Sequence, residues 1–287
     1  MNKDDFCYFL IWIPFLLIAV PYFLLGLGLL CLDLRAPAWY VRWKVKGRRS
    51  TGATVTTLCP APRKLMRVLL FNFGSSLMIT MSTAWALLAR DLTFELPAKE
   101  TPYEAIGKFV VSMFLSDTYF YHSHFLMHTR WFYKYVHSLH HEAVEPFGLV
   151  TNYCSLPELF IVNLPTVFVG PTVTRMSLPL YYGWILTSTV YTMLEHSGLR
   201  PIFFMDPTHH YRHHSMIRGN YGLSPLWDTI YGTVIRRQKR FKGCNSTGTG
   251  NRHSNRNRNR HSNRNCSRTP PGTGGGDTRC RPRSRSF

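Results

Sequence analysis

Five long apolar stretches alternate with polar segments over the first 194 residues of the chain. They cover residues 6–32, 68–89, 106–125, 159–174 and 176–194. The first two contain no charged residue, and the third is interrupted only by Lys108 and Asp117. A helix needs about 18 or more apolar residues to cross a bilayer, because the hydrocarbon core is about 30 Å thick. The pattern therefore predicts an all-α integral membrane helical bundle with four to five spans.

Two of these stretches have unusual features. The stretch 159–174 is short and contains Pro165 and Pro171, which predict a kinked or re-entrant helix. The first stretch resembles a signal peptide but is too long for one, and acidic residues precede it. We interpret it as a retained membrane anchor.

The distribution of charge predicts the topology. The chain has 287 residues and a net charge of +19, and segment 35–67 carries nine Lys and Arg residues but no acid. Short basic loops lie on the cytoplasmic side of membranes. If this loop is cytosolic, the second and third stretches cross out and back, and so do the fourth and fifth. Segments 124–141 and 196–214 should then both face the cytosol.

The C-terminal region differs from the rest of the chain. Residues 244–287 hold ten Arg and one acid, and the octet 251–258 recurs almost intact at 259–266. Such a segment has too few apolar residues to form a core, and we expect a disordered tail with no specific nucleic-acid partner. The predicted organisation is membrane anchor helices and a basic loop over 1–100, a catalytic domain over 101–243, and the tail over 244–287. The seven cysteines form no Cys-x-x-Cys pair and are interpreted as reduced thiols.

Histidines are the main chemical feature. Eleven of thirteen lie between His122 and His214, mostly at helical spacing. They form three clusters and one lone residue, His196. The clusters are His124 with His128, His137 with His140 and His141, and His209 with His210, His213 and His214. Residues three and four apart share one face of a helix, so each cluster can direct several imidazoles at one point. A zinc site takes about four ligands, so this number of histidines predicts two metal ions. The predicted ligands are His124, His128, His137, His140, His141, His196, His209, His210, His213 and His214.

Helical spacing also predicts the roles of other residues near the clusters. Asp117 lies two helical turns before His124 and could accept a hydrogen bond from a ligand imidazole. An acid within an apolar stretch is costly and usually functional. His122 should point away from the face of His124 and His128, and we expect it not to be a ligand. His253 and His261 belong to the repeat in the tail.

The missing motifs narrow the chemistry. The chain has no His-Glu-x-x-His zinc hydrolase motif, no cysteine ligand pair, no phosphate-binding loop and no dinucleotide fingerprint. Iron changes its oxidation state whereas zinc does not, so a pair of nitrogen-bound irons suits oxygen activation. Electrons would then have to come from another protein.

The histidine motifs resemble those of the fatty acid hydroxylase / sterol desaturase superfamily over about residues 105–235. The resemblance also includes Glu195-His196-Ser197-Gly198 and the closing run from Asn220 to Thr233. The stretch from His141 to Gly148 is most similar to C4-methylsterol oxidases. Sphinganine hydroxylases and cholesterol 25-hydroxylases are similar as well. Some members carry a further histidine where this chain has Thr192, so either one iron lacks a ligand here or His209 replaces that histidine.

The resemblance implies a multi-pass enzyme of the endoplasmic reticulum membrane with a di-iron centre of two Fe ions facing the cytosol. It implies O2 as oxidant and electrons from NAD(P)H through cytochrome b5 or its reductase. The expected reaction is oxidation of a C–H bond of a membrane lipid, with a sterol favoured. A sphingoid-base or fatty-acid hydroxylase or desaturase is the alternative enzyme, and a histidine-rich membrane metal carrier is the alternative that is not an enzyme.

Overall fold

The computed structural model describes residues 8–45, 60–88, 98–200 and 206–235, which all belong to one compact unit. Helices and turns make up these ranges, and their only β-type contact is an isolated antiparallel bridge between Lys44 and Leu199. The all-α prediction is confirmed. The predicted tail, 244–287, with His253 and His261, lies outside the described residues.

Within the described ranges, three helices are long and apolar enough to cross a membrane. They are Tyr8–Arg35, which joins the π-helical turn η1 (Tyr8–Trp12) to α2 (Ile13–Arg35), then Pro62–Ser82 within α4 (Pro62–Leu88), and Leu156–Thr174. These helices correspond to the first, second and fourth predicted stretches. The third and fifth stretches form α5 (Pro102–Met127) and α9 (Leu178–Glu195), which have 26 and 18 residues but are less apolar.

The start of α5 is set by a capping box. The Thr101 hydroxyl accepts a hydrogen bond from the Glu104 amide, and the Glu104 carboxylate accepts one from the Thr101 amide at 2.9 Å. This exchange satisfies amide donors that a helix start otherwise leaves without partners. α5 therefore begins at a position that the local sequence dictates.

The fourth stretch is an interrupted helix made of α7 (Leu156–Glu158), the π-helical turn η6 (Leu159–Asn163) and α8 (Leu164–Thr174). Pro165 has no amide hydrogen to donate to the preceding turn, which accounts for the irregular turn just before it. Arg175, with φ at 51°, ends α8, and α9 follows from Leu178. The predicted separation of the two stretches at Arg175 is confirmed.

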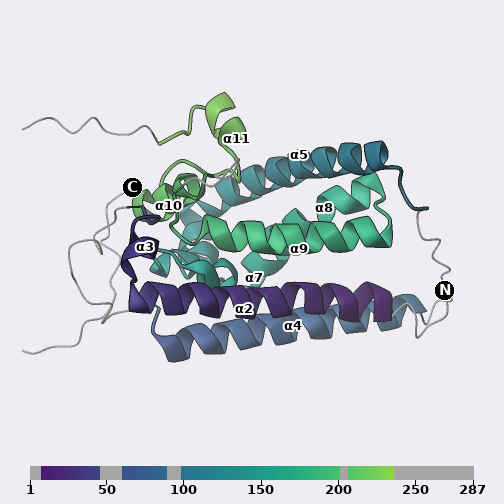
Figure 1. Cartoon of the computed structure of the whole chain (residues 1–287), viewed down its shortest axis with the longest axis horizontal. Coiled ribbons are helices and arrows are strands. Elements are labelled where there is room, and N and C mark those ends of the chain that lie inside the picture. Colours follow the sequence, from purple (N-terminus) through teal and green to yellow (C-terminus); the bar gives the residue numbers. More distant parts are fainter. Residues whose placement is uncertain (1–7, 46–59, 89–97, 201–205, 236–287) are drawn as a thin grey trace, which may run out of the picture. The chain divides into compact units, whose positions relative to one another are not determined.

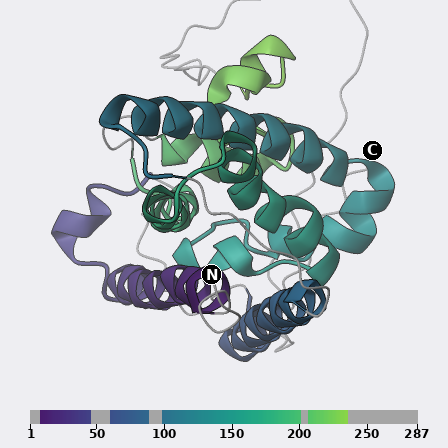
Figure 2. The same cartoon turned by 90° about the vertical axis from the view of Figure 1, so that its right-hand side faces the viewer.

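The helices pack closely where small residues allow it. Figure 2 shows α2 and α4 on one side and α5 on the opposite side. A Cβ added to Gly26 of α2 would lie 2.3 Å from Cδ2 of Leu149, which belongs to the 3-10 turn η5 (Gly148–Asn152). A Cβ added to Gly170 of α8 would lie 2.6 Å from Ser112 Cβ of α5. These contacts hold α2 against the turn η5, and α8 against α5, which carries His124.

One end of the bundle collects the histidine-bearing elements. The C-terminal ends of α5 and α9 lie there beside α10 (Pro207–Met216), and α3 (Ala38–Val41) is at the same end (Figure 1). The irregular chain after α5 contains α6 (Arg130–Phe132), the π-helical turn η3 (Tyr133–His137) and the 3-10 turn η4 (His140–Glu142). The short helix α11 (Pro225–Ile230) follows α10.

Candidate metal centre

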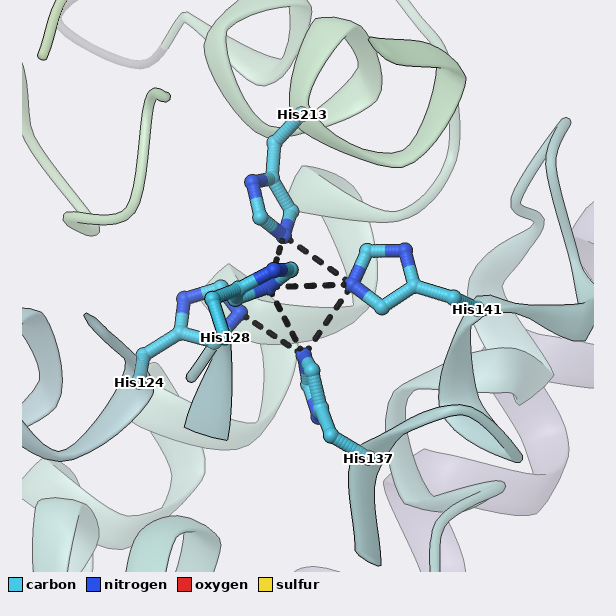
Figure 3. A group of neighbouring side chains, drawn as sticks. All are labelled: His124, His128, His137, His141 and His213. Carbon is cyan, nitrogen blue, oxygen red and sulfur yellow. Dashed lines mark hydrogen bonds between the residues drawn. The ribbon is translucent and has the colours of Figure 1, made fainter. Parts of the chain in front are cut away.

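Nine histidines form two groups whose ring nitrogens converge. Within each group, one nitrogen from every residue lies within 4.8 Å of the others. The first group comprises His124, His128, His137, His141 and His213 (Figure 3). The second comprises His140, His196, His210 and His214. The groups adjoin, since the ring centroids of His140 and His141 are 5.7 Å apart.

In the first group the converging atoms are Nε2 nitrogens. Nε2 of His137 lies 3.1 Å from that of His124 and 3.0 Å from that of His141. Nε2 of His213 lies 3.1 Å from those of His128 and His141. Figure 3 shows these rings entering from different elements with their Nε2 atoms toward one point.

The second group repeats this arrangement with one residue fewer. Nε2 of His210 lies 3.0 Å from that of His196 and 3.1 Å from that of His214. Nε2 of His196 and of His140 are 3.3 Å apart. The lone His196, which directly follows α9, thus belongs to a group with residues of two clusters.

Neighbouring histidines serve different groups. His140 belongs to the second group and His141 to the first, and His214 and His213 divide in the same way. Successive residues in a helical turn point about 100° apart, so a His-His pair has to diverge. The expectation that each cluster directs its imidazoles at one point therefore fails for these two clusters. Each of them supplies both groups, which is why the groups lie side by side.

Backbone carbonyls accept hydrogen bonds from the outer nitrogens of five imidazoles. The Nδ1 contacts are His124 with Tyr221 O (2.7 Å), His213 with Gly219 O (2.8 Å), His140 with Tyr153 O (3.2 Å), His196 with Thr192 O (2.8 Å) and His214 with Ala143 O (3.1 Å). A carbonyl only accepts, so each of these Nδ1 atoms carries the proton. The Nε2 lone pair then faces the centre of the group.

A buried carboxylate lies behind a sixth imidazole. Glu158 Oε1 is 2.9 Å from Nδ1 of His137, and both side chains are almost wholly buried. A carboxylate in this position orients a ligand imidazole and increases its basicity. The sequence did not single out Glu158, although an acid at the edge of an apolar stretch was a usable signal.

The spacing of the Nε2 atoms fits bound metal ions. Lone pairs that face one another at about 3 Å repel unless a cation lies among them. Nitrogens about 2.1 Å from one ion lie about 3.0 Å apart at right angles and about 3.4 Å apart in a tetrahedron. The observed separations are 3.0–3.3 Å. Each group therefore has the spacing and the donor type of a site for one ion.

Burial keeps these imidazoles neutral. Burial lowers the pKa of His196 to about 4, and burial with neighbouring imidazoles holds the pKa values of His137 and His141 well below their usual range. The exposed fraction of His213 and of His214 is 0%. The neutral ring is the form that binds a metal, so the site does not have to be deprotonated near neutral pH.

His209, predicted as a ligand, is in neither group. Its Nε2 lies 3.0 Å from Oδ2 of Asp228, which is completely buried. Asp228 also accepts hydrogen bonds from the amides of Tyr221 and Gly222, both at 2.9 Å, and from the Thr233 hydroxyl at 2.6 Å. Burial raises the pKa of Asp228, but these four donors outweigh it, so the net shift is downward. The closing run is thus a loop held around one carboxylate.

Asp117 does not touch an imidazole, in contrast to the expected contact. Its carboxylate accepts from the amides of Leu223 (3.0 Å) and Ser224 (3.1 Å) and from the Ser224 hydroxyl (2.5 Å). The same loop carries Tyr221, whose carbonyl accepts from His124. Asp117 therefore acts on His124 only through the loop that it holds.

His122 lies outside both groups, as predicted. It is exposed, its Nδ1 lies 2.7 Å from the Thr118 carbonyl, and its ring packs edge-on against Trp227 at 5.3 Å between centroids.

A largely apolar cavity extends from the histidine groups between the helices. Its empty space is about 1160 Å³, including the part that is open to the outside. His140, His196 and His210 line it together with Glu195. Its apolar lining includes Phe15, Ile18, Phe73, Leu164 and Val167. An apolar molecule in this cavity would reach the histidines.

Comparison with known proteins gives a family match for the segment that holds both histidine groups. Residues 109–233 match the profile of the family described as Fatty acid hydroxylase. This segment is thus similar to fatty acid hydroxylase domains. Every histidine of both groups lies within it.

Two plant proteins are similar over more than this segment, and a human protein is similar over a shorter stretch. Methylsterol monooxygenase 2-2 of Arabidopsis thaliana is 28% identical over 245 residues, 79% of this chain and 87% of that protein. Very-long-chain aldehyde decarbonylase GL1-11 of Oryza sativa is 26% identical over 233 residues, 77% of this chain and 84% of that protein. Human fatty acid hydroxylase domain-containing protein 2 is 32% identical over 119 residues, 42% and 36% of the two chains. No solved structure matches the chain significantly.

The segment 109–233 has a threonine, Thr192, one helical turn before His196. Its carbonyl accepts from Nδ1 of His196, and its side chain lines the cavity. His209 does not replace it as a further nitrogen, because His209 is engaged with Asp228. The second group therefore has four histidines where the first has five.

Proposed function

We propose that this protein is a membrane-bound, O2-dependent di-iron oxygenase that oxidises a C–H bond of a lipid. One observation carries the proposal. Two groups of buried imidazoles with convergent Nε2 lone pairs lie at one end of an apolar cavity between membrane helices. The family match and the monooxygenase relatives support the same reaction class.

The first group would hold one iron through His124, His128, His137, His141 and His213. The second would hold the other through His140, His196, His210 and His214. Bound iron would supply the change of oxidation state that oxidation of an unactivated C–H bond by O2 requires. The protein's part is to keep the imidazoles neutral, to orient them through carbonyls and Glu158, and to admit a lipid while excluding bulk water.

A sterol is the favoured substrate. Two plant relatives and one from rat are named methylsterol monooxygenases, and the chain covers 87% of the first of them. A fatty-acid or sphingoid-base hydroxylase or desaturase is the alternative, since the same centre and cavity would take a chain lipid. Other relatives are named very-long-chain aldehyde decarbonylases, so chain lipids should be tested as substrates beside sterols.

Location and electron supply form part of the proposal. The basic segment 35–67 supports a cytosolic orientation of the histidine groups, and we propose that the membrane is that of the endoplasmic reticulum. Because the sequence has no dinucleotide fingerprint, electrons would come from NAD(P)H through cytochrome b5 or its reductase. We further propose that 1–100 is the anchor region, 101–243 the catalytic domain and 244–287 a tail without a catalytic role.

Two histidines provide the sharpest test, one inside the second group and one outside both groups. We expect about two irons per chain in the purified protein, about one in His210→Ala, and about two in the control His122→Ala, whose ring is exposed. Turnover of a 4-methylsterol with NADH, O2, cytochrome b5 and its reductase should be lost only in the former. Active protein that contains zinc and no iron would refute the proposal.

A further inference from the structure

Glu195, the last residue of α9, is a buried acid. Its exposed fraction is 2%, and it lines the cavity beside His196. Neither of its carboxyl oxygens has a hydrogen bond of normal geometry among the described residues. The hydroxyl of Tyr191 lies close enough to Glu195 to interact with it, but its single proton is donated to the Leu223 carbonyl at 3.0 Å. Two acceptor atoms are therefore left at the wall of a cavity.

Several other polar side chains in the cavity wall are already satisfied, although Oε2 of Glu158 also has no partner. Asn72 Nδ2 donates to the carbonyls of Asn152 and Cys154, both at 3.0 Å. The hydroxyl of Thr166 donates to the Val162 carbonyl at 2.7 Å, and that of Thr189 to the Ile185 carbonyl at 2.9 Å. A buried polar group without a partner is costly, and native structures contain few of them. Glu195 therefore requires an explanation that these residues do not.

Glu195 is not a fifth ligand of the second histidine group. None of its oxygens lies within 4.8 Å of all four nitrogens that define this group. It also differs from Glu158, whose Oε1 is already occupied by Nδ1 of His137 at 2.9 Å. The free acceptors of Glu195 are thus available to whatever occupies the cavity.

We propose that Glu195 accepts a hydrogen bond from a hydroxyl group of the lipid substrate, at the histidine end of the cavity. A carboxyl group can accept such a bond whether or not it is ionised. The role given to Glu195 rests on the proposed function, because it requires a lipid in this cavity. The proposed hydrogen bond requires that the substrate is an alcohol and that its hydroxyl lies close to the carbon that is oxidised. A 3-hydroxysterol oxidised near its hydroxyl-bearing ring meets this condition, whereas a chain lipid oxidised far from its polar end does not.

Binding of two matched sterols tests the proposal directly. The probes are a tritiated 4-methyl-3β-hydroxysterol and its 3-O-methyl ether, which keeps the shape but cannot donate a hydrogen bond. Binding is measured on the metal-loaded protein in lipid nanodiscs. Wild-type protein should bind the alcohol about tenfold or more tightly than the ether. In Glu195→Leu this preference should fall to nearly one, while binding of the ether is retained.

Two further variants guard against trivial outcomes. Thr189→Val also alters the wall of the cavity on α9, but its hydroxyl is satisfied within the helix, so the preference should remain. Glu195→Gln keeps the shape and one acceptor oxygen, so its preference should lie between wild type and Glu195→Leu. Iron content equal to that of wild type shows that each variant is folded around the centre.

The outcomes separate this proposal from the proposed function. A preference that persists in Glu195→Leu overturns the role of Glu195, even if the sterol is oxidised normally. A preference that disappears in Glu195→Leu, without any oxidation of the sterol, supports that role and rejects the oxygenase. Failure of wild-type protein to bind either probe overturns the sterol alcohol as the ligand. If both proposals hold, Glu195→Leu should raise KM for the alcohol more than it lowers kcat.

Discussion

Replacing Asp228 by asparagine tests whether the closing run serves as a scaffold for the first histidine group. Oδ1 of Asp228 accepts hydrogen bonds from Tyr221 N and the Thr233 hydroxyl, and Oδ2 accepts from Gly222 N and Nε2 of His209. In Asp228→Asn one of these oxygens becomes an amide NH2. That group then faces two donors and satisfies neither.

The size of the effect follows from these contacts. A hydrogen bond to a charged group contributes about 1.5–3 kcal/mol, so the loss of two amounts to about 3–6 kcal/mol. His209 can change its tautomer and accept from the new NH2, which offsets part of the loss. We expect a destabilisation of about 2–4 kcal/mol, which corresponds to roughly 5–15 °C in the unfolding temperature.

The loss of metal should be selective. The loop around Asp228 contributes the carbonyls of Tyr221 and Gly219, which orient His124 and His213. Both histidines belong to the first group. Iron content in Asp228→Asn should therefore fall from about two per chain toward one, with the second group retaining its ion.

The assay combines thermal unfolding in detergent with metal analysis of the same preparation. Thr229→Val is the matched control, because Thr229 lies next in α11, is exposed, and donates only to the Pro225 carbonyl at 2.7 Å. Wild-type stability and full iron content in Asp228→Asn would refute the scaffold role. Equal loss of both ions would refute the prediction that this loop orients only histidines of the first group.

Three further predictions concern the outer contacts, the packing and the effect of pH. Glu158→Gln should release metal to a chelator about 10–100-fold more readily, since the carboxylate behind His137 is lost; unchanged retention would exclude this role. Gly170→Ala should destabilise the protein by about 1–3 kcal/mol in thermal unfolding because of the contact with Ser112, whereas Gly183→Ala, with no atom within 4 Å of the added Cβ, should not. The metal-free protein should lose stability from pH 7 to pH 5. The unfolded chain binds protons at a pKa of about 6.5, while the pKa of His196 in the fold is about 4, so this residue alone accounts for about 2 kcal/mol; stability that rises on acidification would contradict this.

Much of this protein is specified by local sequence. Apolar length determined the helices Tyr8–Arg35, Pro62–Ser82 and Leu156–Thr174, because a long run of apolar residues has few alternatives to a buried or membrane-spanning helix. The number and spacing of histidines determined that imidazoles would gather in two groups. His122 was separated from the groups correctly, because its direction on α5 depends only on helical geometry.

The tertiary structure determines to which group each histidine belongs and which residues contact its outer nitrogen. His209 and His210 are neighbours in sequence, yet one meets Asp228 and the other joins the second group. That outcome depends on a loop that returns to α10 from residues 220–233, which no local pattern encodes. Asp117 was recognised as an unusual acid, but its partners lie 106 and 107 residues away.

The surroundings of the two buried glutamates could not be predicted from the sequence either. In the sequence, Glu158 and Glu195 are acids at the edges of apolar stretches, where a position at the membrane surface is equally reasonable. Only packing against α5, α10 and the chain after α5 buries both of them and places one on His137 and the other, unpaired, in the cavity wall. Helical periodicity gives the direction of a side chain on its own helix, but the identity of its partner depends on contacts between distant segments. For this reason most members of the two histidine groups could be predicted from the sequence, and the residues that orient them could not.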